Sequence, residues 1–495
     1  MFKQYINGKL VDGRGRVMEV INPATYEVID TVGCANAEQT EEALQAAAKA
    51  FKTWSKVPVG KRCEWIAKFR AACVEEFDTL VDLIMKESGR PYDAACGDVN
   101  WLLTSLSYYP EEAKRIEGAI LPTPAAEVYH VVVREPIGVT VGHLAWNYPL
   151  GNASIKLAPA MASGCTCIIK PSSDTPLATL YLGVIAEKIG LPEGILNIIA
   201  GPSSEVAATL NKSDIPRMIS CIGSYETGLK ILQQSATSMK RYSLELGGNA
   251  PVVVMPDADL EATAANIVAK KVGFAGQTCV NYNRIYIHES IYEVMCEKIA
   301  AELSKVKLGY GKDEGYVMGP VINMQARDRM LDLIDDAVKS GAKLVMGGTV
   351  PEEFKKGSFI TPAFLRDVTD DMRVSTEEIF GPIITIYVYD DKDFIETLEL
   401  CDSTSPYALT GAFFAYDLKA QQIANDKLKY AAGNFYINDK PTGAVVGCQP
   451  FGGSRASGTN DKAGGLWNLI RWTNPRSIKE TFVPATDYSY PFLAK

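Results

Sequence analysis

The sequence is poor in the groups that build metal sites and disulfide frameworks. It has 3 histidines in 495 residues (His130, His143 and His288), too far apart along the chain to suggest a local metal site. Its 11 cysteines are unevenly spaced and include no CxxC pair, so they form neither a disulfide nor a zinc pattern. Unpaired thiols in this number indicate a reducing compartment.

Long apolar segments and basic runs are also missing. No stretch is long enough to span a bilayer, and the N-terminal residues lack the apolar run of a signal peptide. The formal net charge of -9 argues against nucleic acid and against an anionic membrane as a partner. We therefore expect a soluble, cytoplasmic protein that binds a small molecule, with no metal, no nucleic acid and no membrane.

The GxGxxG fingerprint of dinucleotide-binding folds is absent, although the chain alternates strands and helices as those folds do. The patterns predict strands at 138–144, 165–169, 196–199 and 218–222, and helices at 154–163 and 176–188. Ligands of open α/β sheets bind outside the carboxyl ends of the strands. We therefore expect Trp146-Asn147, Lys170, Gly201 and Gly223-Ser224 to share one rim. The Gly-Ser turn opens a helix whose N-terminal amides suit a diphosphate.

A second α/β pattern follows Glu245, with strands predicted at 252–255, 284–288, 383–389, 411–415 and 434–438 and a helix at 260–273. Near the N-terminus, Asn36 is a predicted N-cap of a helix, and one long helical pattern runs through Trp65 and Ile84 to end near Gly89. Two α/β domains that meet near residues 245–280 would form a ligand site at their interface.

Residues 120–138 and the tail from 476 form neither pattern. Val128 to Val133 is β-prone, and Thr481 to Val483 is a candidate strand. A protruding hairpin paired with a terminal strand would be an oligomerisation flap, and an ordinary edge hairpin is the alternative.

The stretch Gly276-Gln277-Thr278-Cys279-Val280 is the candidate catalytic centre. A cysteine reacts as its thiolate, and a turn of glycine and threonine leaves it open to substrate. Glu245, in Glu245-Leu246-Gly247-Gly248, suits a general base for a water that attacks a thioester. Asn147 and the backbone N–H of Cys279 suit an oxyanion hole. Taken singly, Cys279 also fits a core cysteine and Asn147 a turn residue.

Together, in this order and spacing, these motifs resemble the aldehyde dehydrogenase superfamily over essentially the whole chain. The resemblance implies an α/β fold with a Rossmann-like cofactor domain, an α/β catalytic domain and a small β oligomerisation flap. It also implies NAD or NADP as cofactor and a homodimer or homotetramer. An aldehyde would form a thiohemiacetal and then a thioester on Cys279. Relatives that pass the acyl group to coenzyme A generally lack the glutamate at 245, so Glu245 favours hydrolysis to the free acid.

The same resemblance implies further site residues. Lys156 falls where the family has a lysine near the active site, Lys170-Pro171 resembles its adenosine-ribose site, and Glu378 lies in the motif whose carboxylate holds the nicotinamide ribose. Many NAD-preferring relatives have a glutamate where Ser173 stands, so NADP should be tolerated. The predicted cofactor-binding residues are Trp146, Lys170, Ser172, Ser173, Gly201, Gly223, Ser224, Leu246, Gly247, Glu378 and Phe380.

The implied domains are a cofactor domain at 1–119 and 139–246 and a catalytic domain at 247–448. Residues 120–138 and 476–495 would form the oligomerisation hairpin and tail. Residues 449–475 would form a substrate anchor loop and the return to the cofactor domain.

Residues 435–482 resemble the glutamate-semialdehyde (pyrroline-5-carboxylate) dehydrogenases. In those enzymes the backbone amides of the loop matching Gly458-Thr459-Asn460 hold the carboxylate of the substrate. The predicted substrate-binding residues are Ser457, Gly458, Thr459, Phe451 and Tyr148. That subfamily usually has threonine where Leu246 stands and serine where Val280 stands, so the agreement is local.

The two arginines that succinate-semialdehyde enzymes use to hold their substrate correspond here to Ile155 and Gly273. That charge clamp is missing, so we predict oxidation of a small polar or carboxylated aldehyde of the semialdehyde type. The alternatives are oxidation of a hydroxyaldehyde such as lactaldehyde, oxidation of succinate semialdehyde, thiol esterase activity without redox, and a non-catalytic protein on the same fold.

Overall fold

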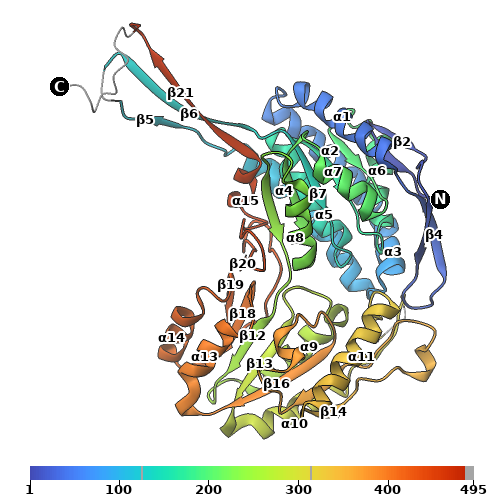
Figure 1. Ribbon diagram of the computed structural model, residues 1–495, viewed down its shortest axis with the longest axis vertical. Coiled ribbons are helices and arrows are strands. Elements are labelled where there is room, and N and C mark those ends of the chain that lie inside the picture. The colour runs from blue at the N-terminus through green and yellow to red at the C-terminus, as the bar shows by residue number, and fades with distance from the viewer. Residues whose placement is uncertain (124–125, 313–314, 485–495) are drawn as a thin grey trace.

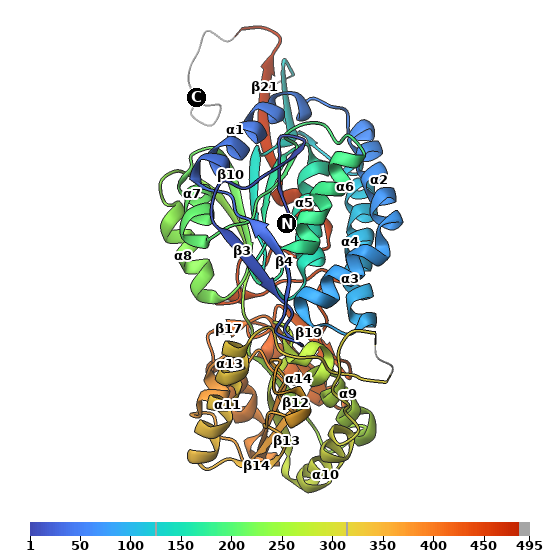
Figure 2. The same cartoon turned by 90° about the vertical axis from the view of Figure 1, so that its right-hand side faces the viewer.

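The chain forms two lobes and a projecting arm (Figure 1). The structure is a computed structural model that describes residues 1–123, 126–312 and 315–484. Figure 2, turned by 90°, shows the lobe built from the first half of the chain stacked on the lobe that contains β12 to β19. The expectation of two α/β units and a small β arm is confirmed, whereas the exact domain boundaries stay a prediction.

The first lobe is built on a sheet with the strand order β11-β10-β7-β8-β9-β1-β2. Strands β7 to β11 pair with one another in parallel. At one edge of the sheet, β1 pairs antiparallel with both β9 and β2. Their bounds are β1 Gln4–Ile6, β2 Lys9–Val11, β7 Val139–His143, β8 Thr166–Lys170, β9 Leu196–Ile198, β10 Pro216–Ile222 and β11 Arg241–Glu245. Because the central strands are parallel, their carboxyl ends meet at one edge, which faces the second lobe (Figure 1).

Helices cover both faces of this sheet. They are α1 Ala37–Trp54, α2 Val59–Glu75, α3 Phe77–Ser88, α4 Tyr92–Ala113, α5 Pro149–Ser163, α6 Leu177–Lys188, α7 Ala208–Lys212, α8 Tyr225–Ser235 and α15 Leu466–Arg471. Asn36 caps α1 as predicted, because its Oδ1 accepts the Gln39 N–H at 2.9 Å. The single long helix expected through Trp65 and Ile84 is two helices, broken at Glu76. Helix α4 was not predicted, and its Gly97 and Pro110 obscure its apolar pattern.

The second lobe repeats the α/β principle with the strand order β14-β15-β16-β13-β12-β18-β19. All adjacent pairs are parallel except β14 with β15. The strands are β12 Ala250–Val254, β13 Tyr282–His288, β14 Lys343–Met346, β15 Ala363–Arg366, β16 Ile383–Tyr389, β18 Thr410–Phe414 and β19 Asn434–Ile437. The helices are α9 Leu260–Val272, α10 Tyr292–Leu303, α11 Met324–Lys339, α12 Arg373–Thr376, α13 Phe394–Ser403 and α14 Leu418–Leu428.

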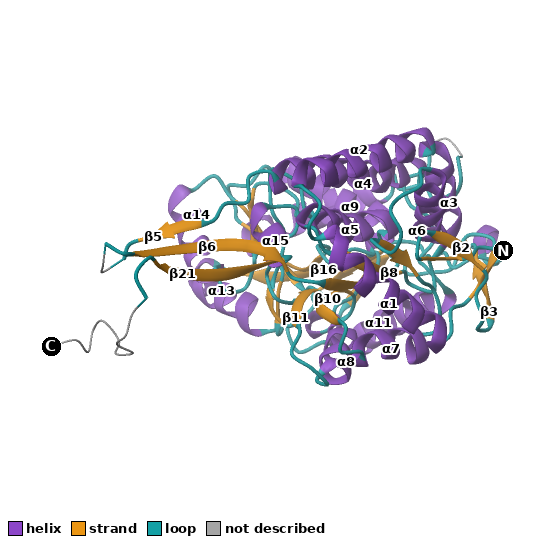
Figure 3. Cartoon of the chain, turned by 90° about the horizontal axis from the view of Figure 1, so that it is seen from above, coloured by secondary structure: helices purple, strands orange, loops and turns teal. Residues whose placement is uncertain are grey.

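The projecting arm is a sheet of three strands, β5 Ala119–Leu121, β6 Val128–Pro136 and β21 Thr473–Thr481, with β6 in the middle. Strand β21 pairs antiparallel with the whole of β6, from Thr473 opposite Pro136 to Thr481 opposite Val128. Figure 3 shows this sheet extending away from both lobes. The terminal strand therefore pairs with the hairpin as predicted, although it ends at Thr481 where we had placed its start. The predicted tail beyond residue 484 lies outside the described residues.

Two short sheets complete the described fold, β3 Val17–Ile21 with β4 Val28–Gly33 and β17 Tyr407–Ala408 with β20 Ser454–Arg455. In the part of the chain that the structure describes, no helix is both long enough and apolar enough to cross a membrane.

Candidate active site

A cleft of about 980 Å³ runs along the carboxyl ends of β7, β8 and β10 to Cys279. The predicted site residues that line it are Trp146, Asn147, Lys170, Ser172, Ser173, Gly223, Ser224, Leu246, Gly247, Cys279, Glu378 and Phe380. Gly201 is not among the lining residues. It lies where the side chain of Val206 and the carbonyl of Ala35 leave no room for a Cβ atom.

The lining groups fit a dinucleotide with two phosphates. The Ser224 side chain caps α8 by accepting the Thr227 N–H at 3.2 Å, so the amides at the start of this helix face the cleft. Lys170 is buried at the cleft wall, and its ammonium donates only to the Pro171 carbonyl at 3.2 Å. Burial lowers the pKa of Lys170 to about 8, and a bound anion would favour its charged form.

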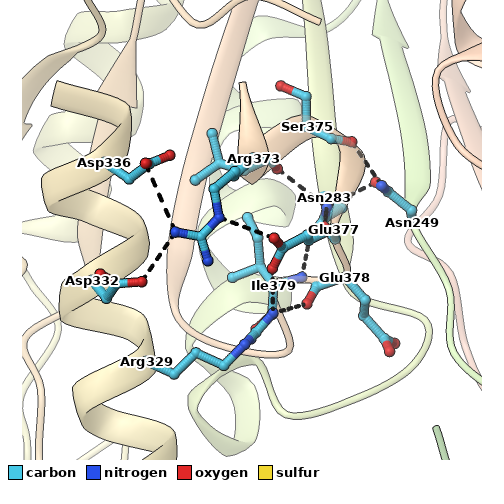
Figure 4. A network of polar contacts seen from close by, with 11 residues as sticks. Asn249, Asn283, Arg329, Asp332, Asp336, Arg373, Ser375, Glu377, Glu378 and Ile379 are labelled. Atoms are coloured by element: carbon cyan, nitrogen blue, oxygen red, sulfur yellow. Dashed lines mark hydrogen bonds and ion pairs between the residues drawn. The ribbon is translucent and has the colours of Figure 1, made fainter. Parts of the chain in front are cut away.

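Glu378 lines the cleft beside the Gly247-Gly248 turn. Its Oε1 accepts the Gly248 N–H at 2.9 Å, and a Cβ on Gly247 would lie 2.4 Å from its Oε2, so a larger residue there would displace this carboxylate. Arg329 holds the backbone of this loop by donating to the carbonyls of Ile379 at 2.8 Å and Glu378 at 2.9 Å. Figure 4 shows the Glu378 carboxylate pointing away from this arginine network. Burial raises the pKa of Glu378 to about 7.

Cys279 follows a strained turn. Phe274 and Ala275, inside the 3₁₀ turn Gly273–Gly276, have φ of 50° and 49°, a left-handed conformation that is costly for residues with a Cβ. Gly276 has no such cost, but a Cβ there would lie 2.3 Å from the Gly381 carbonyl. The half-buried Cys279 thiol has its pKa raised to about 12 by burial and by the carboxylates of Glu378 and Glu245. The resting thiol is therefore protonated.

Asn147 lies close to Cys279 and is held in a fixed orientation. One Nδ2–H donates to the Gln277 carbonyl at 3.1 Å, and its Oδ1 accepts from Asn152 at 3.3 Å. The second Nδ2–H of this amide has no partner among the described residues. The backbone N–H of Cys279 donates to no other residue in the described chain. These are the two donors that an oxyanion hole requires.

Glu245 ends β11 behind the cleft, and Lys156 reaches the same region from α5. Both side chains are buried, and neither the Glu245 carboxylate nor the Lys156 ammonium has a hydrogen-bond partner among the described residues. Burial raises the pKa of Glu245 to about 8, while the positive charges of Lys156 and Lys462 oppose the shift. Burial also lowers the pKa of Lys156. The pKa of Glu245 therefore lies close to the pH of 7 to 8 at which a general base must accept a proton.

The predicted substrate residues separate into two groups. Phe451 packs with Val280 and Leu409 against Cys279, and the ring of Tyr148 lies 6.3 Å from that of Phe274. These two side chains are near the nucleophile.

The loop with Ser457, Gly458 and Thr459 does not form the predicted anion anchor. Its amides donate to the carbonyls of Ser454 at 3.0 Å, Arg455 at 3.3 Å and Leu244 at 3.0 Å. Because all three N–H groups are used within the protein, they are not free for a substrate carboxylate. The loop instead braces the end of β11, where the Thr459 hydroxyl accepts the Leu244 N–H at 2.8 Å.

Sequence reasoning missed two other groups near Cys279. The amides of Gly443 and Ala444 donate to no residue in the described chain, and Ala444 packs against the same cluster as Cys279. Lys270, near the end of α9, forms no ion pair among the described residues, and burial lowers its pKa to about 8 although the Cys279 thiol opposes the shift. A lysine pair at the end of an apolar helix pattern was the available signal.

Comparison with known proteins agrees with this geometry. The model of the aldehyde dehydrogenase family matches residues 10–478. The glutarate-semialdehyde dehydrogenase of Pseudomonas putida is 36% identical over 92% of this chain and 94% of its own. The NADP-dependent succinate-semialdehyde dehydrogenase GabD of Escherichia coli is 34% identical over the same shares. The crystal structure of betaine aldehyde dehydrogenase from Staphylococcus aureus with NAD+ superposes with a TM-score of 0.94 at 30% identity, covering 99% of this chain and 97% of that one.

Proposed function

The chain belongs to the aldehyde dehydrogenase family, and from this premise we propose that it oxidises a short aldehyde with an anionic far end to the free acid. It is an NAD(P)-dependent aldehyde oxidoreductase. The observation that carries the proposal is the position of Cys279 beside two free donors, the second Asn147 N–H and its own backbone N–H. Glu245, with a pKa raised to about 8, supplies the base.

In the first half of the reaction, the Cys279 sulfur bonds to the carbonyl carbon of the aldehyde as the thiol gives up its proton to the solvent of the cleft. The carbonyl oxygen gains the electron pair and is held by the Asn147 and Cys279 N–H groups. When bound, the nicotinamide accepts the hydride that this carbon must lose. Lys170, Ser173, Ser224 and Glu378 are the residues proposed to hold the cofactor in the cleft.

In the second half, Cys279 carries the acyl group as a thioester. Glu245 takes a proton from water, and the oxygen of that water bonds to the acyl carbon. The same two N–H groups hold the oxyanion again. The carbon–sulfur bond then breaks and the acid leaves. The proton taken up by Glu245 passes to the Cys279 sulfur, which regenerates the thiol and the carboxylate.

An anionic substrate is supported by the charge near Cys279. Lys270 has no anionic partner in the described chain. The amides of Gly443 and Ala444, which are also free in the described chain, belong to a second segment near Cys279. Desolvation disfavours the ammonium, so a carboxylate brought next to it would be stabilised. The glutarate- and succinate-semialdehyde enzymes among the relatives act on aldehydes that carry a carboxylate.

A matched pair of aldehydes tests this proposal. We would compare glutarate semialdehyde with pentanal, using NAD and NADP in turn and following NAD(P)H absorbance. We expect kcat/KM to favour the charged aldehyde by at least about tenfold, the equivalent of one ion pair of ~1.4 kcal/mol. Lys270→Met should remove most of this preference, and Lys419→Met, at an exposed lysine of α14, should leave it intact.

Two results would overturn the proposal. A preference for pentanal in the wild-type protein would show that the substrate end is not an anion site. NAD(P)H formation by Cys279→Ala would show that the redox reaction does not pass through this thiol.

We also propose that the arm formed by β5, β6 and β21 makes the protein a homodimer or homotetramer. Both outer strands of the arm have an unpaired edge in the described chain, and Ile120, Tyr129 and Phe482 expose apolar surface there. The mass in solution, measured by light scattering, distinguishes a dimer or tetramer from a monomer.

A cytoplasmic location is proposed from the thiols. The structure pairs none of the 11 cysteines, all of which are described, in a disulfide. Fractionation of the cells that produce the protein tests this, and recovery outside the cytoplasm would contradict it.

A further inference from the structure

Arg90 is buried between two aromatic rings next to the nucleophile turn. It follows Gly89, which ends α3 with φ of 68°, and its side chain is 1% exposed. The guanidinium carbon lies 4.1 Å from the centre of the Tyr148 ring and 4.0 Å from that of Phe274. Tyr148 is the neighbour of Asn147, and Phe274 begins the strained turn before Cys279. A single cation thus contacts both segments that form the oxyanion hole.

The polar contacts of Arg90 reach the same two segments. One terminal nitrogen donates to the backbone carbonyl of Asn147, and the other donates to the Ala94 carbonyl at 3.4 Å. Buried Asp98 accepts the N–H groups of Leu150 at 3.2 Å and Gly151 at 2.8 Å, in the first turn of α5.

The Arg90 charge also acts on Asp98. Burial raises the pKa of the Asp98 carboxyl, and the cation opposes that shift. Arg90 therefore holds Asn147 and Tyr148, and Asp98 holds the first turn of α5 that follows them.

These contacts close a ring through the site. The side chain of Asn147 donates to the Gln277 carbonyl at 3.1 Å, and the Gln277 N–H donates to the Phe274 carbonyl at 3.1 Å. The Phe274 ring then packs on Arg90, whose guanidinium donates to Asn147. Removing Arg90 breaks this cycle of contacts at two points, the packing on the Phe274 ring and the hydrogen bond to the Asn147 carbonyl. The left-handed Phe274 then keeps its contacts with the rings of Trp146 and Tyr148 but loses the cation that packs on its ring.

We propose that Arg90 is a positioning residue that aligns the Asn147 amide and the Cys279 N–H as one oxyanion hole. Arg90 does not itself line the cleft, and its contacts at the site are with Asn147, Tyr148 and Phe274, so it acts through the donors. The inference rests on the proposed role of Asn147. A cation that merely fills the space between the two rings would contribute to folding but not to the rate of the folded enzyme.

Arg90→Met removes the charge, the donors and the planar group while keeping an unbranched side chain. We expect the first-turnover burst of NAD(P)H to slow by about tenfold, less than the 10²–10³ that follows complete loss of an oxyanion donor. KM for the aldehyde and Kd for the cofactor should change less than about twofold. Arg115→Met, at an exposed arginine just after α4, is the matched control and should not slow the burst.

Two measurements separate alignment from folding. Alkylation of Cys279 by iodoacetamide needs the thiolate but no oxyanion hole, so Arg90→Met should react at the wild-type rate. In the Asn147→Ala background, Arg90→Met should slow the burst by less than about threefold, because the donor it aligns is already gone. An equal slowing in both backgrounds, or a parallel loss of alkylation, would overturn the inference.

Arg90→Lys keeps the experiment decisive if Arg90→Met does not fold. It retains the charge and a donor but loses the planar stacking, so a smaller slowing in the same direction is expected, again absent in Asn147→Ala. A burst at the wild-type rate in Arg90→Lys, with Arg90→Met unfolded, would assign Arg90 to folding alone. If Asn147→Ala by itself leaves the burst unchanged, the proposed oxyanion hole fails, which is a different result from failure at Arg90.

Discussion

Glu245 is a buried carboxyl group whose oxygens have no hydrogen-bond partner among the described residues. Burial raises its pKa to about 8. A general base accepts a proton only when it is ionised, so hydrolysis of the thioester should accelerate as the pH rises and level off above about 8. We expect this profile in steady-state kcat with saturating aldehyde and cofactor between pH 6 and 9.5. A kcat that is flat over this range would assign the base to another group.

Removing the charge of Glu245 separates the two half-reactions. Glu245→Gln should keep the first-turnover burst of NAD(P)H, which precedes hydrolysis, while steady-state turnover falls by roughly 10²–10⁴. Stopped-flow absorbance measures both quantities in one experiment. Loss of burst and turnover in equal proportion would mean that Glu245 acts on the thiol before the aldehyde reacts.

Ser173 and Lys170 both line the cleft, and the serine side chain carries no charge. Ser173→Glu should raise the Kd of NADP by at least about tenfold more than the Kd of NAD, because a carboxylate repels the 2′-phosphate. Kd for each cofactor, measured by fluorescence titration, tests this. Ser173→Ala removes the hydroxyl without adding charge and should leave the ratio of the two Kd values near that of the wild type. Equal weakening by the glutamate would show that this position does not face the ribose.

At the scale of one element, α9 buries a lysine that has no role in the proposed chemistry. The Lys271 ammonium is fully buried without a hydrogen-bond partner in the described chain, and burial lowers its pKa from 10.5 to about 7. The folded state therefore resists protonation, so Lys271 costs stability as the pH falls from 10.5 to about 7, and the cost stays constant below that.

Lys271→Met removes this cost and keeps the side-chain length. We expect a stability gain on the order of a few kcal/mol at pH 6 that shrinks steadily toward pH 10. Calorimetric Tm at both pH values measures the change, with Lys419→Met as the exposed control. A gain that does not depend on pH would show that packing, and not the charge, is responsible.

Elements also differ in how far they could be predicted. The parallel strands and their following turns were located from apolar runs and from Gly, Ser and Pro at their ends, which are local signals. The break at Glu76 and the helix at 92–113 were not, because α2 and α3 both pack on α4, and α2 and α4 pack on α5. That packing decides where each helix ends.

For the whole molecule, the projecting arm is the feature that a single lobe does not need. Ile120 is 69% exposed on β5, and Ile478 faces solvent on β21. If these strands join two protomers, Ile120→Asp combined with Ile478→Asp should convert the oligomer to monomers, because two buried charges without partners oppose assembly. Light scattering coupled to size exclusion measures the mass. Ile120→Ser with Ile478→Ser is the uncharged control, and an unchanged mass in the aspartate variant would place the interface elsewhere.

The family, the two α/β patterns and the residues at the ends of the strands could all be predicted from the amino-acid sequence. Cys279, Glu245, Asn147, Lys170 and Gly223 were located because turn chemistry and strand periodicity are local. The carboxyl ends of parallel strands then share one edge in any fold that pairs them.

Which of the candidate groups remain free could be read only from the folded chain. The amides of Ser457, Gly458 and Thr459 looked available in sequence, but two of them bond within their own turn and the third bonds to Leu244. Arg90, which the sequence marked only as the end of a helix, lies between Tyr148 and Phe274. The identity of a residue does not show whether its backbone N–H or its guanidinium already has a partner. Its partners lie far along the chain, so only the folded contacts reveal its role.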